Sequence, residues 1–151
     1  MAKKKQESTM TAKKKNVWDN YVKNYIRMRD CDANGYGQCV SCGKVIHYKD
    51  GDAGHYLFKG STWERIRFEE DNLGLQCKKC NTHLSGNITA WFRRVADKYG
   101  YQFASGSDER LRGLCHNKDG SFKPFRWDKE KLQKVKDYYK PRLKKVKERV
   151  V

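Results

Sequence analysis

Cys39-Val40-Ser41-Cys42 and Cys77-Lys78-Lys79-Cys80 are the two stretches that decide the fold of this chain. In each Cys-x2-Cys pair a tight turn brings two thiolates to one metal ion, and two pairs supply the four ligands of a tetrahedral zinc site. The spacing therefore predicts a structural zinc held by Cys39, Cys42, Cys77 and Cys80. Between the pairs lies Gly54-His55-Tyr56, and Asn81 follows the second pair directly.

The redox state of the cysteines depends on the compartment. Residues 1–15 are polar and rich in lysine, unlike a signal peptide, and no apolar run approaches the length that crosses a bilayer. We therefore expect a cytoplasmic protein without membrane contact, in which the six cysteines stay reduced and metal binding is favoured over disulfides. Cys31 and Cys115 lack a close partner in sequence and are interpreted as small buried hydrophobic residues.

The composition indicates a nucleic-acid partner. The chain has 151 residues, 37% of them hydrophobic, and a formal charge of +16. Residues 1–15 carry six lysines against Glu7, giving +5, and residues 123–151 carry twelve basic against four acidic side chains, giving +8. Two basic ends around a nearly balanced middle suit a polyanion such as DNA, because cations near phosphates release condensed counterions. The alternative is a solvated tail and a solvated helix.

The patterns along the chain predict an α+β fold with a small zinc-stabilised ββα core. Residues 1–15 are expected to be a disordered basic tail, and residues 16–126 one zinc-stabilised domain. That domain begins with a helix over 16–30, since the apolar residues Trp18, Tyr21, Tyr25 and Met28 recur at steps of three and four. The ββα core would comprise strands over 53–58 and 66–68 and a helix over 81–99, whose buried stripe is Ile88, Trp91, Phe92 and Val95. Beyond Gly100 we expect a loop-rich region with a short helix from Ser107 to Leu114.

Residues 127–151 are predicted to form a long basic helical segment. Its apolar residues recur from Leu132 to Val150 at steps of three and four, which gives a narrow seam of the kind that joins helices. Pro141 lacks an amide proton and crowds the carbonyl of Asp137, so we expect a kink or two shorter helices. The seam fits two alternatives, a homodimer interface and packing within one chain.

The residues between and after the cysteine pairs suggest hydrolysis of a phosphodiester. This reaction needs a base that activates water and a cation that stabilises the developing charge. His55 is the candidate base, and Asn72 is the candidate that orients it through the backbone or the imidazole. Asn81 and Asp52 are candidate ligands for Mg²⁺ or Mn²⁺. Strand alternation puts Asp52 and His55 on opposite faces, so Asp52 reaches the site only through a bulge or twist.

Ordered blocks of the sequence resemble the phage NinG (Rap) recombination family over residues from about 18 to 100. The blocks are Tyr25-Ile26-Arg27-Met28-Arg29-Asp30, Cys39-Val40-Ser41-Cys42-Gly43-Lys44, Ala53-Gly54-His55-Tyr56, Ile66-Arg67-Phe68 with Asp71-Asn72, and Gln76-Cys77-Lys78-Lys79-Cys80-Asn81 with Ser85-Gly86-Asn87. More distantly, the order Cys-x2-Cys, His, Cys-x2-Cys-Asn is similar to recombination endonuclease VII and the wider HNH (His-Me finger) nucleases. This resemblance implies that residues 16–126 are a zinc-stabilised, HNH-like nuclease domain and that its ββα core is a His-Me finger.

The resemblance implies a metal-dependent endonuclease that cleaves branched DNA, such as a Holliday junction or a D-loop, during phage recombination in the host cell cytoplasm. In the HNH pattern His55 corresponds to the general base, Asn81 to a ligand of the catalytic metal, and the four cysteines to the structural zinc ligands. Many HNH sites carry an aspartate immediately before the base. This chain has Gly54 there, so the carboxylate ligand is unassigned and Asp52 is only a candidate.

Two other functions account for part of the same pattern. A non-catalytic zinc-ribbon module that binds DNA explains the cysteines and the charge, and an HNH nickase of ordinary duplex DNA explains His55 as well. In each case DNA would be bound mainly through its backbone. Six residues are candidates for contact with DNA: Lys78, Lys79, Arg93 and Arg94 by charge, and His83 with Asn87 because their spacing fits one helical face.

Overall fold

The α+β class is confirmed by a computed structural model that describes residues 2–58 and 60–150. The helices are α1 (Ala2–Val17), α2 (Lys23–Arg29), α3 (Ile88–Tyr99), α4 (Tyr101–Leu114) and α5 (Lys129–Arg149). The strands are β1 (Tyr36–Gln38), β2 (Val45–His47), β3 (Asp52–His55) and β4 (Leu73–Gln76). Short helical turns connect them: η1 (Trp18–Val22), η2 (Tyr48–Asp50), η3 (Ser61–Ile66), η4 (Glu70–Asn72) and η5 (Lys79–His83).

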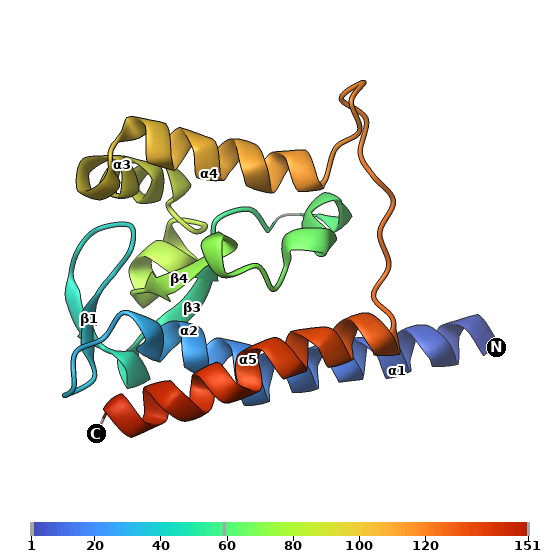
Figure 1. Ribbon diagram of the computed structural model, residues 1–151, viewed down its shortest axis with the longest axis horizontal. Coiled ribbons are helices and arrows are strands. Elements are labelled where there is room, and N and C mark those ends of the chain that lie inside the picture. The colour runs from blue at the N-terminus through green and yellow to red at the C-terminus, as the bar shows by residue number, and fades with distance from the viewer. Residues whose placement is uncertain (1, 59, 151) are drawn as a thin grey trace.

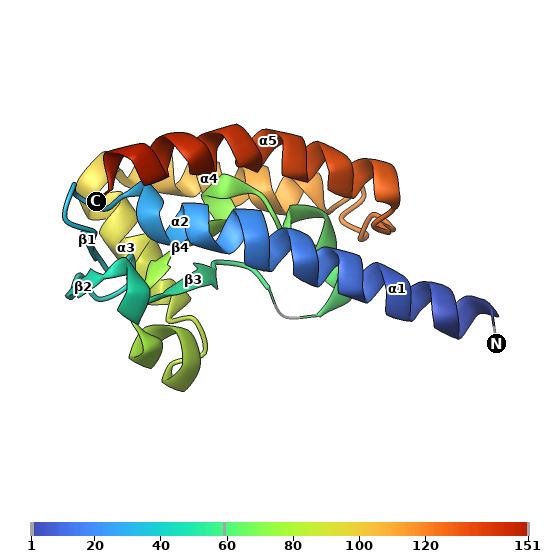
Figure 2. The ribbon, with the colours of Figure 1, turned by 90° about the horizontal axis from the view of Figure 1, so that it is seen from below.

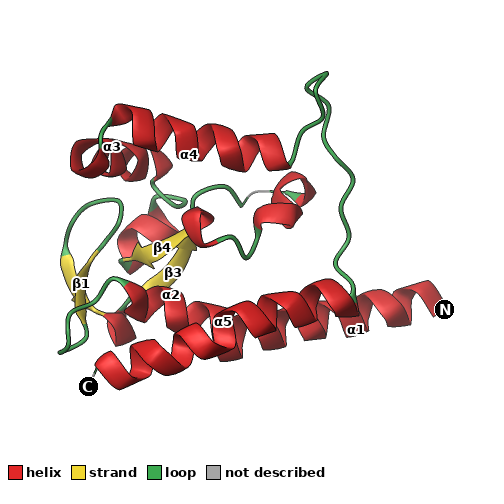
Figure 3. Ribbon diagram, viewed as in Figure 1, coloured by secondary structure: helices red, strands yellow, loops and turns green. Residues whose placement is uncertain are grey.

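The antiparallel pair β3–β4 lies at the centre of three layers (Figures 1 and 3). Helices α3 and α4 form one outer layer, and α1, α2 and α5 form the other. A second antiparallel pair, β1–β2, lies at one end and carries the first cysteine pair in its connection. In the described part of the chain, no helix is both long and apolar enough to cross a bilayer.

The C-terminal part of α1 contacts α5, although the two helices are far apart in sequence, and the N-terminal part of α1 projects past α5 (Figures 1 and 2). Val22 and Ile26 share one hydrophobic cluster with Leu132 and Tyr139 of α5. Farther along α5, a second cluster buries Leu143, Val146 and Val150 against Met28 of α2. The seam on α5 therefore packs within the chain, which leaves no apolar seam for the homodimer that was its alternative use.

Helix α5 continues through Pro141, so the expectation of two shorter helices is wrong. A proline inside a helix costs one hydrogen bond and local crowding, about 3 kcal/mol. Tyr139 and Leu143, on either side of Pro141, are buried in the two clusters that hold α5 against the core. Their burial outweighs the local cost, since each fully buried side chain of this size contributes about 1.5–3 kcal/mol.

At the other end, the helix predicted over 16–30 begins at Ala2 and ends at Arg29, with the turn η1 between α1 and α2. Residues 2–15, expected to be disordered, form most of α1, and Met1 lies outside the described residues. This stretch contains six lysines and two alanines, which are good helix formers. It extends a helix that tertiary contacts already hold, so no new nucleus is needed.

The predicted second strand, residues 66–68, is wrong, and the strand that pairs with β3 is β4. Ile66 and Phe68 are buried, but from the end of η3 and the segment after it, in two different clusters. All four residues of β4 are buried on both faces of the pair, so β4 lacks the alternation of polar and apolar residues that marks a half-buried strand. The first strand also ends early, at His55.

The helix predicted over 81–99 is divided into η5 and α3. The break lies at Ser85, Gly86 and Asn87, which have φ angles of +49°, +91° and +43°. Three successive left-handed residues cannot continue a right-handed helix. Of the predicted buried stripe, Trp91 is buried, whereas Ile88 at the start of α3 is exposed. In the region expected to be loop-rich with a short helix from Ser107 to Leu114, all of residues 101–114 form α4, so the helix ends where predicted but begins earlier.

Candidate functional site

The four predicted zinc ligands form one cluster. Cys39 and Cys42 lie between β1 and β2, Cys77 and Cys80 follow β4, and their Sγ atoms all lie within 4.8 Å of one another. The Sγ atoms of Cys42 and Cys77 are 3.8 Å apart. Zn–S bonds of about 2.3 Å in a tetrahedron would place sulfur atoms about 3.8 Å apart. The cluster can therefore hold a metal such as zinc. Cys31 and Cys115 are buried, as expected, and are not among its four ligands, although Cys31 packs beside Cys39, Cys77 and Cys80.

The backbone around Cys39 favours its thiolate, whereas burial raises the pKa of Cys42 and that of Cys80. Burial alone would raise the pKa of Cys39, but backbone N–H groups of Cys42, Cys77 and Ser41 outweigh it and lower the pKa to about 7. Asn87 lies at the start of α3 and donates from Nδ2 to Sγ of Cys80 over 3.4 Å. The prediction that Asn87 shares a helical face with His83 is therefore wrong, since His83 is exposed at the end of η5.

The four basic residues predicted to contact DNA differ in their surroundings. The side chains of Lys79 and Arg93 are exposed and form no ion pair or hydrogen bond with the described part of the chain. Lys78 is also exposed but forms an ion pair with Asp52. Arg94 donates from Nη2 to Oε1 of Gln38 over 3.0 Å and lies against Gly43 in the turn of the first cysteine pair. Arg94 thus braces that turn, and contact with DNA stays a prediction for all four.

His55 is the last residue of β3, and its ring is fixed in two ways. Nε2 donates to the backbone carbonyl of Arg67 over 3.0 Å, since a carbonyl oxygen can only accept. The ring also stacks on Trp18, with centroids 5.0 Å apart and planes 22° apart. Burial lowers the pKa of His55 from 6.5 to about 4. At neutral pH the imidazole is therefore uncharged, and Nδ1 carries the lone pair of a base.

Trp18 is the residue near His55 that sequence reasoning missed. The spacing assigned it only to the apolar stripe of the first helix. It enters from the π-helical turn η1, which interrupts the α-helix between α1 and α2, and such turns are frequent at functional sites. Phe58 also lies beside the His55 ring, with 6.2 Å between the two ring centroids. No local signal in the sequence marks which aromatic residue meets His55 from a distant segment.

Asn72 acts through the backbone rather than on the imidazole. It is fully buried, and its Oδ1 accepts from the N–H of Leu57 over 2.8 Å. Its Nδ2 donates to the carbonyl of Leu57 over 2.9 Å and to that of Ile66 over 3.2 Å. Ile66 directly precedes Arg67, whose carbonyl holds His55. Of the two roles predicted for Asn72, the structure has the backbone one, so Asn72 is a positioning residue.

Asp52 and Asn81 are brought together, as predicted for a pair of metal ligands. Nδ2 of Asn81 donates to Oδ2 of Asp52 over 3.1 Å, and Nζ of Lys78 lies 3.0 Å from Oδ1 of Asp52. A carboxylate and an amide oxygen are donors that suit Mg²⁺. This pair does not form one cluster with His55. All four residues of β3 pair in regular register with β4, so the bulge that Asp52 required is not formed.

Gly54 faces a side chain that fills the space in front of it. A Cβ atom added at Gly54 would lie 1.8 Å from Oε1 and 2.6 Å from Cδ of Gln76. Gln76 is fully buried, and its Nε2 donates to Oγ of Ser41 over 2.8 Å and to the carbonyl of Gly86 over 2.6 Å. The amide is thus fixed, and it excludes the aspartate that many HNH sites carry before the base.

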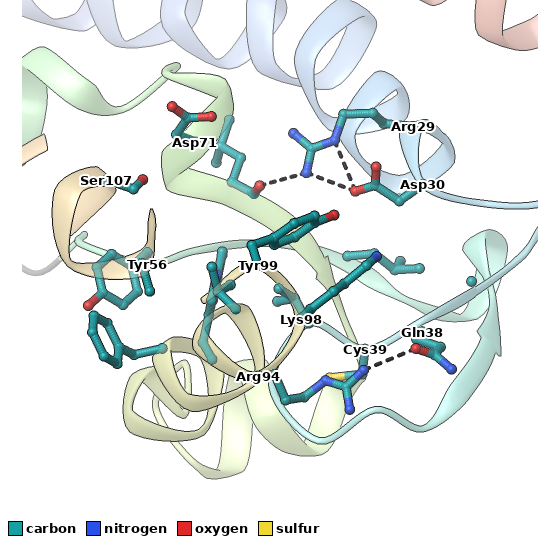
Figure 4. A pocket seen from close by; sticks show the side chains of 18 of the residues that line it. Arg29, Asp30, Gln38, Cys39, Tyr56, Asp71, Arg94, Lys98, Tyr99 and Ser107 are labelled. Carbon is teal, nitrogen blue, oxygen red and sulfur yellow. Dashed lines mark hydrogen bonds and ion pairs between the residues drawn. The ribbon is translucent and has the colours of Figure 1, made fainter. Parts of the chain in front are cut away.

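A cavity of about 600 Å³ lies between α3, α4 and the segment from Arg29 to Val40 (Figure 4). It contains neither His55 nor the Asp52–Asn81 pair. Carboxylates outnumber basic side chains in its lining, five to three. Arg29 pairs with Asp30, and Asp108 accepts from the hydroxyl of Tyr56 over 2.7 Å. A lining with this charge disfavours binding of a phosphate group.

The chain is similar to a set of phage proteins along most of its length. The family model described as Bacteriophage Lambda NinG protein matches residues 1–149. Proteins named Protein ninG are similar over 123 residues, 82% of this chain: at 30% identity in Escherichia phage lambda, 31% in Salmonella phage P22 and 30% in Escherichia phage 933W. The match covers 52–53% of those proteins, so the chain spans about half their length. No solved structure matches. With its four-cysteine cluster and matching family model, the chain belongs to the bacteriophage lambda NinG family.

Proposed function

We propose that the chain is a metal-dependent endonuclease that cleaves branched DNA, such as a Holliday junction or a D-loop, in phage recombination. The observation that carries the proposal is the state of His55. Its Nε2–H is held by the carbonyl of Arg67, its ring is stacked on Trp18, and its pKa is lowered to about 4 by burial. A fixed imidazole with Nδ1 unprotonated at neutral pH can accept a proton from water, as a general base does, although a pKa of about 4 makes it a weaker base than an unperturbed histidine.

In this proposal the frame is an HNH-like ββα unit made of β3, β4 and η5, with α3 beyond it. A zinc ion on the four cysteines would fix the turn that carries Asn81 relative to β3. Asn72 would hold the loop between β3 and β4 and, through Ile66, the carbonyl on which His55 is oriented. Each of these residues acts by position, so the chemistry depends on His55.

Asp52 and Asn81 would hold a catalytic Mg²⁺ or Mn²⁺. Bound there, the ion would supply positive charge against the charge that develops on the phosphate and the leaving oxygen. Lys78 now neutralises Asp52, and its side chain is 68% exposed, so it can turn toward a DNA phosphate instead. The assignment of these ligands is separate from that of His55, because the two groups lie on opposite faces of β3.

The charge distribution supports DNA as the substrate. Residues 1–15 and 123–151 together carry +13 of the net +16, and the C-terminal part of α1 contacts α5. The turn η1 continues directly from α1 and brings Trp18 onto His55, and Lys14 lies 3.4 Å from Glu64 in the neighbouring turn η3. A DNA backbone bound along the basic helices would therefore pass close to His55.

One observation favours a second candidate, the non-catalytic zinc module that binds DNA. The base and the predicted metal ligands project from opposite faces of β3, whereas a one-metal nuclease site needs them around one phosphate. The third candidate, a nickase of ordinary duplex DNA, uses the same residues as the branched-DNA enzyme and differs only in its substrate.

Cleavage of a labelled four-way junction and a matched linear duplex separates the three candidates. Wild type, His55→Ala, Asn81→Ala and the matched control His47→Ala would be compared at equal zinc content, with Mg²⁺, with Mn²⁺ and without either. We expect metal-dependent cleavage of the junction, reduced about 10²–10⁴-fold in His55→Ala and unchanged in His47→Ala. Equal cleavage of the duplex would favour the nickase, and binding without cleavage by wild type would favour the zinc module.

A further inference from the structure

The segment of residues 115–127, which we call the aromatic arm, connects α4 to α5 and is anchored at both ends. Figure 1 shows it in orange, rising beyond the end of α4 and then descending to α5. Its first residue, Cys115, is buried, and its last, Trp127, packs on Phe68 with centroids 4.9 Å apart. His116 and Phe122 form a bridge across a tight turn. The arm therefore presents a defined hairpin to solvent.

The hairpin carries a group of aromatic rings that contact one another in tilted and edge-on orientations. Phe122 is 54% exposed, and its ring lies 4.5 Å from that of His116 and 6.2 Å from that of Trp63 in η3. The guanidinium of Arg112 lies over Trp63, 5.7 Å from the ring centre. Trp63 and His116 are half-buried, and Trp63 packs against the buried cluster that contains Leu111 and Cys115, whereas Phe122 lies outside that cluster and stays largely exposed.

Basic side chains alternate with these rings along the arm. Phe125 lies between two cations, Arg65 and Lys131, each 4.7 Å from its ring centre. From residue 112 to residue 131 the chain has six lysines and arginines against three acidic residues. Aromatic faces beside cations form the surface that binds single-stranded nucleic acid, in which bases stack on rings and phosphates meet the cations.

We propose that the aromatic arm binds unpaired nucleotides, with a base stacked on Phe122 and the neighbouring phosphates held by basic side chains of the arm. The inference deepens the proposed function on which it rests, since branched DNA exposes unpaired or unstacked bases at its branch. Fully paired duplex offers no such base, because its bases are stacked on one another inside the helix. The arm would therefore contribute selectivity for structure rather than for sequence.

The inference is tested by binding of a fluorescein-labelled oligothymidine of about 20 nucleotides and of a duplex of the same length, without added divalent metal so that no cleavage occurs. We expect Phe122→Ala to weaken binding of the oligothymidine about 5- to 100-fold, the range for loss of one stacked base, and to leave duplex binding unchanged. Phe122→Trp keeps a stacking face and should restore binding. Phe103→Ala is the matched control, because Phe103 is similarly exposed, at 57%, on α4 away from the arm.

Two results would overturn the inference. One is that Phe122→Ala binds oligothymidine like wild type, and the other is that wild type binds it no more tightly than duplex, which would assign the arm to a protein partner instead. Neither result depends on cleavage. If wild type cleaves the junction while Phe122→Ala binds normally, only the role of the arm fails. If oligothymidine binding depends on Phe122 but wild type never cleaves, the inference about the arm holds and the proposed nuclease activity is contradicted.

Discussion

Replacing Gly54 by alanine or aspartate is expected to destabilise the protein, although aspartate would restore the residue that many HNH sites carry. The new Cβ atom would lie 1.8 Å from Oε1 of Gln76, which is far inside van der Waals contact. If Gln76 were exposed, the end of its side chain could move aside at little cost. Gln76 is fully buried, and its Nε2 is held by Ser41 and Gly86, so it moves only by giving up both hydrogen bonds.

The size of the effect follows from those two bonds. A buried donor or acceptor left without a partner costs about 1–3 kcal/mol, so displacement of the Gln76 amide should cost about 2–5 kcal/mol. This is a large part of the 5–15 kcal/mol that stabilises a typical domain. Urea titrations of wild type, Gly54→Ala, Gln76→Ala and the double variant, all with zinc bound, give the free energies of unfolding for a double-mutant cycle.

In the Gln76→Ala background the space in front of Gly54 is empty, and the added methyl group of Gly54→Ala should cost less than about 1 kcal/mol. The expected coupling between the two sites is therefore about 2–4 kcal/mol. A cost of Gly54→Ala that is equal in both backgrounds would refute the reasoning, because it would show that Gln76 is not what excludes a side chain. A thermal midpoint of Gly54→Asp at or above that of wild type would do the same.

Three further outcomes are expected. Cys80→Ser should lose stoichiometric zinc and lower the thermal midpoint by more than about 10 °C, whereas Cys115→Ser, also buried but outside the cluster, should keep the metal; zinc content and thermal melts check both. The folded state holds the proton of His55 more weakly than the unfolded chain does. The free energy of unfolding should thus fall as the pH drops from 6.5 to about 4 and level off below, and His55→Gln should remove that part of the slope in urea titrations. Asn72→Ala, which breaks three buried hydrogen bonds, should cost about 2–4 kcal/mol, while exposed Asn16→Ala stays within about 0.5 kcal/mol in the same assay.

The parts of the site that sequence could predict are those set by local chemistry. The spacing of the cysteine pairs fixes which thiolates can reach one ion, and the four Sγ atoms lie together as expected. The contact between Asn81 and Asp52 could also be predicted from the sequence, because Asn81 directly follows Cys80 in the turn beside β3 that the cysteine cluster fixes. Such features depend on a few covalent bonds and one turn, so distant segments do not alter them.

The parts that failed are set by packing between distant segments. β4 was missed because burial on both faces removes the alternation that marks a strand, and Gly74 and Gln76 lower its apolar content. The helix after β4 was predicted too long, because three residues with left-handed backbone angles interrupt it after η5 and no proline in the sequence marks the break. Trp18 was assigned to a core stripe, since only the fold brings η1 against His55.

The geometry of β3 determines where a carboxylate ligand can come from. Side chains alternate along a strand, so positions 52 and 54 lie on one face and His55 lies on the other. Gln76 closes position 54 to any side chain, and Asp52 is then the nearest carboxylate on the face of Asn81. That shift of two residues moves the carboxylate about 7 Å along the strand, away from His55. The distance between the carboxylate and the His55 base would therefore be larger than in a site whose aspartate directly precedes the histidine, and one phosphate would have to reach both groups. If cleavage depends on both Asp52 and His55, DNA must bridge the end of β3; if it depends on His55 and Asn81 but survives in Asp52→Asn, another oxygen supplies the metal ligand.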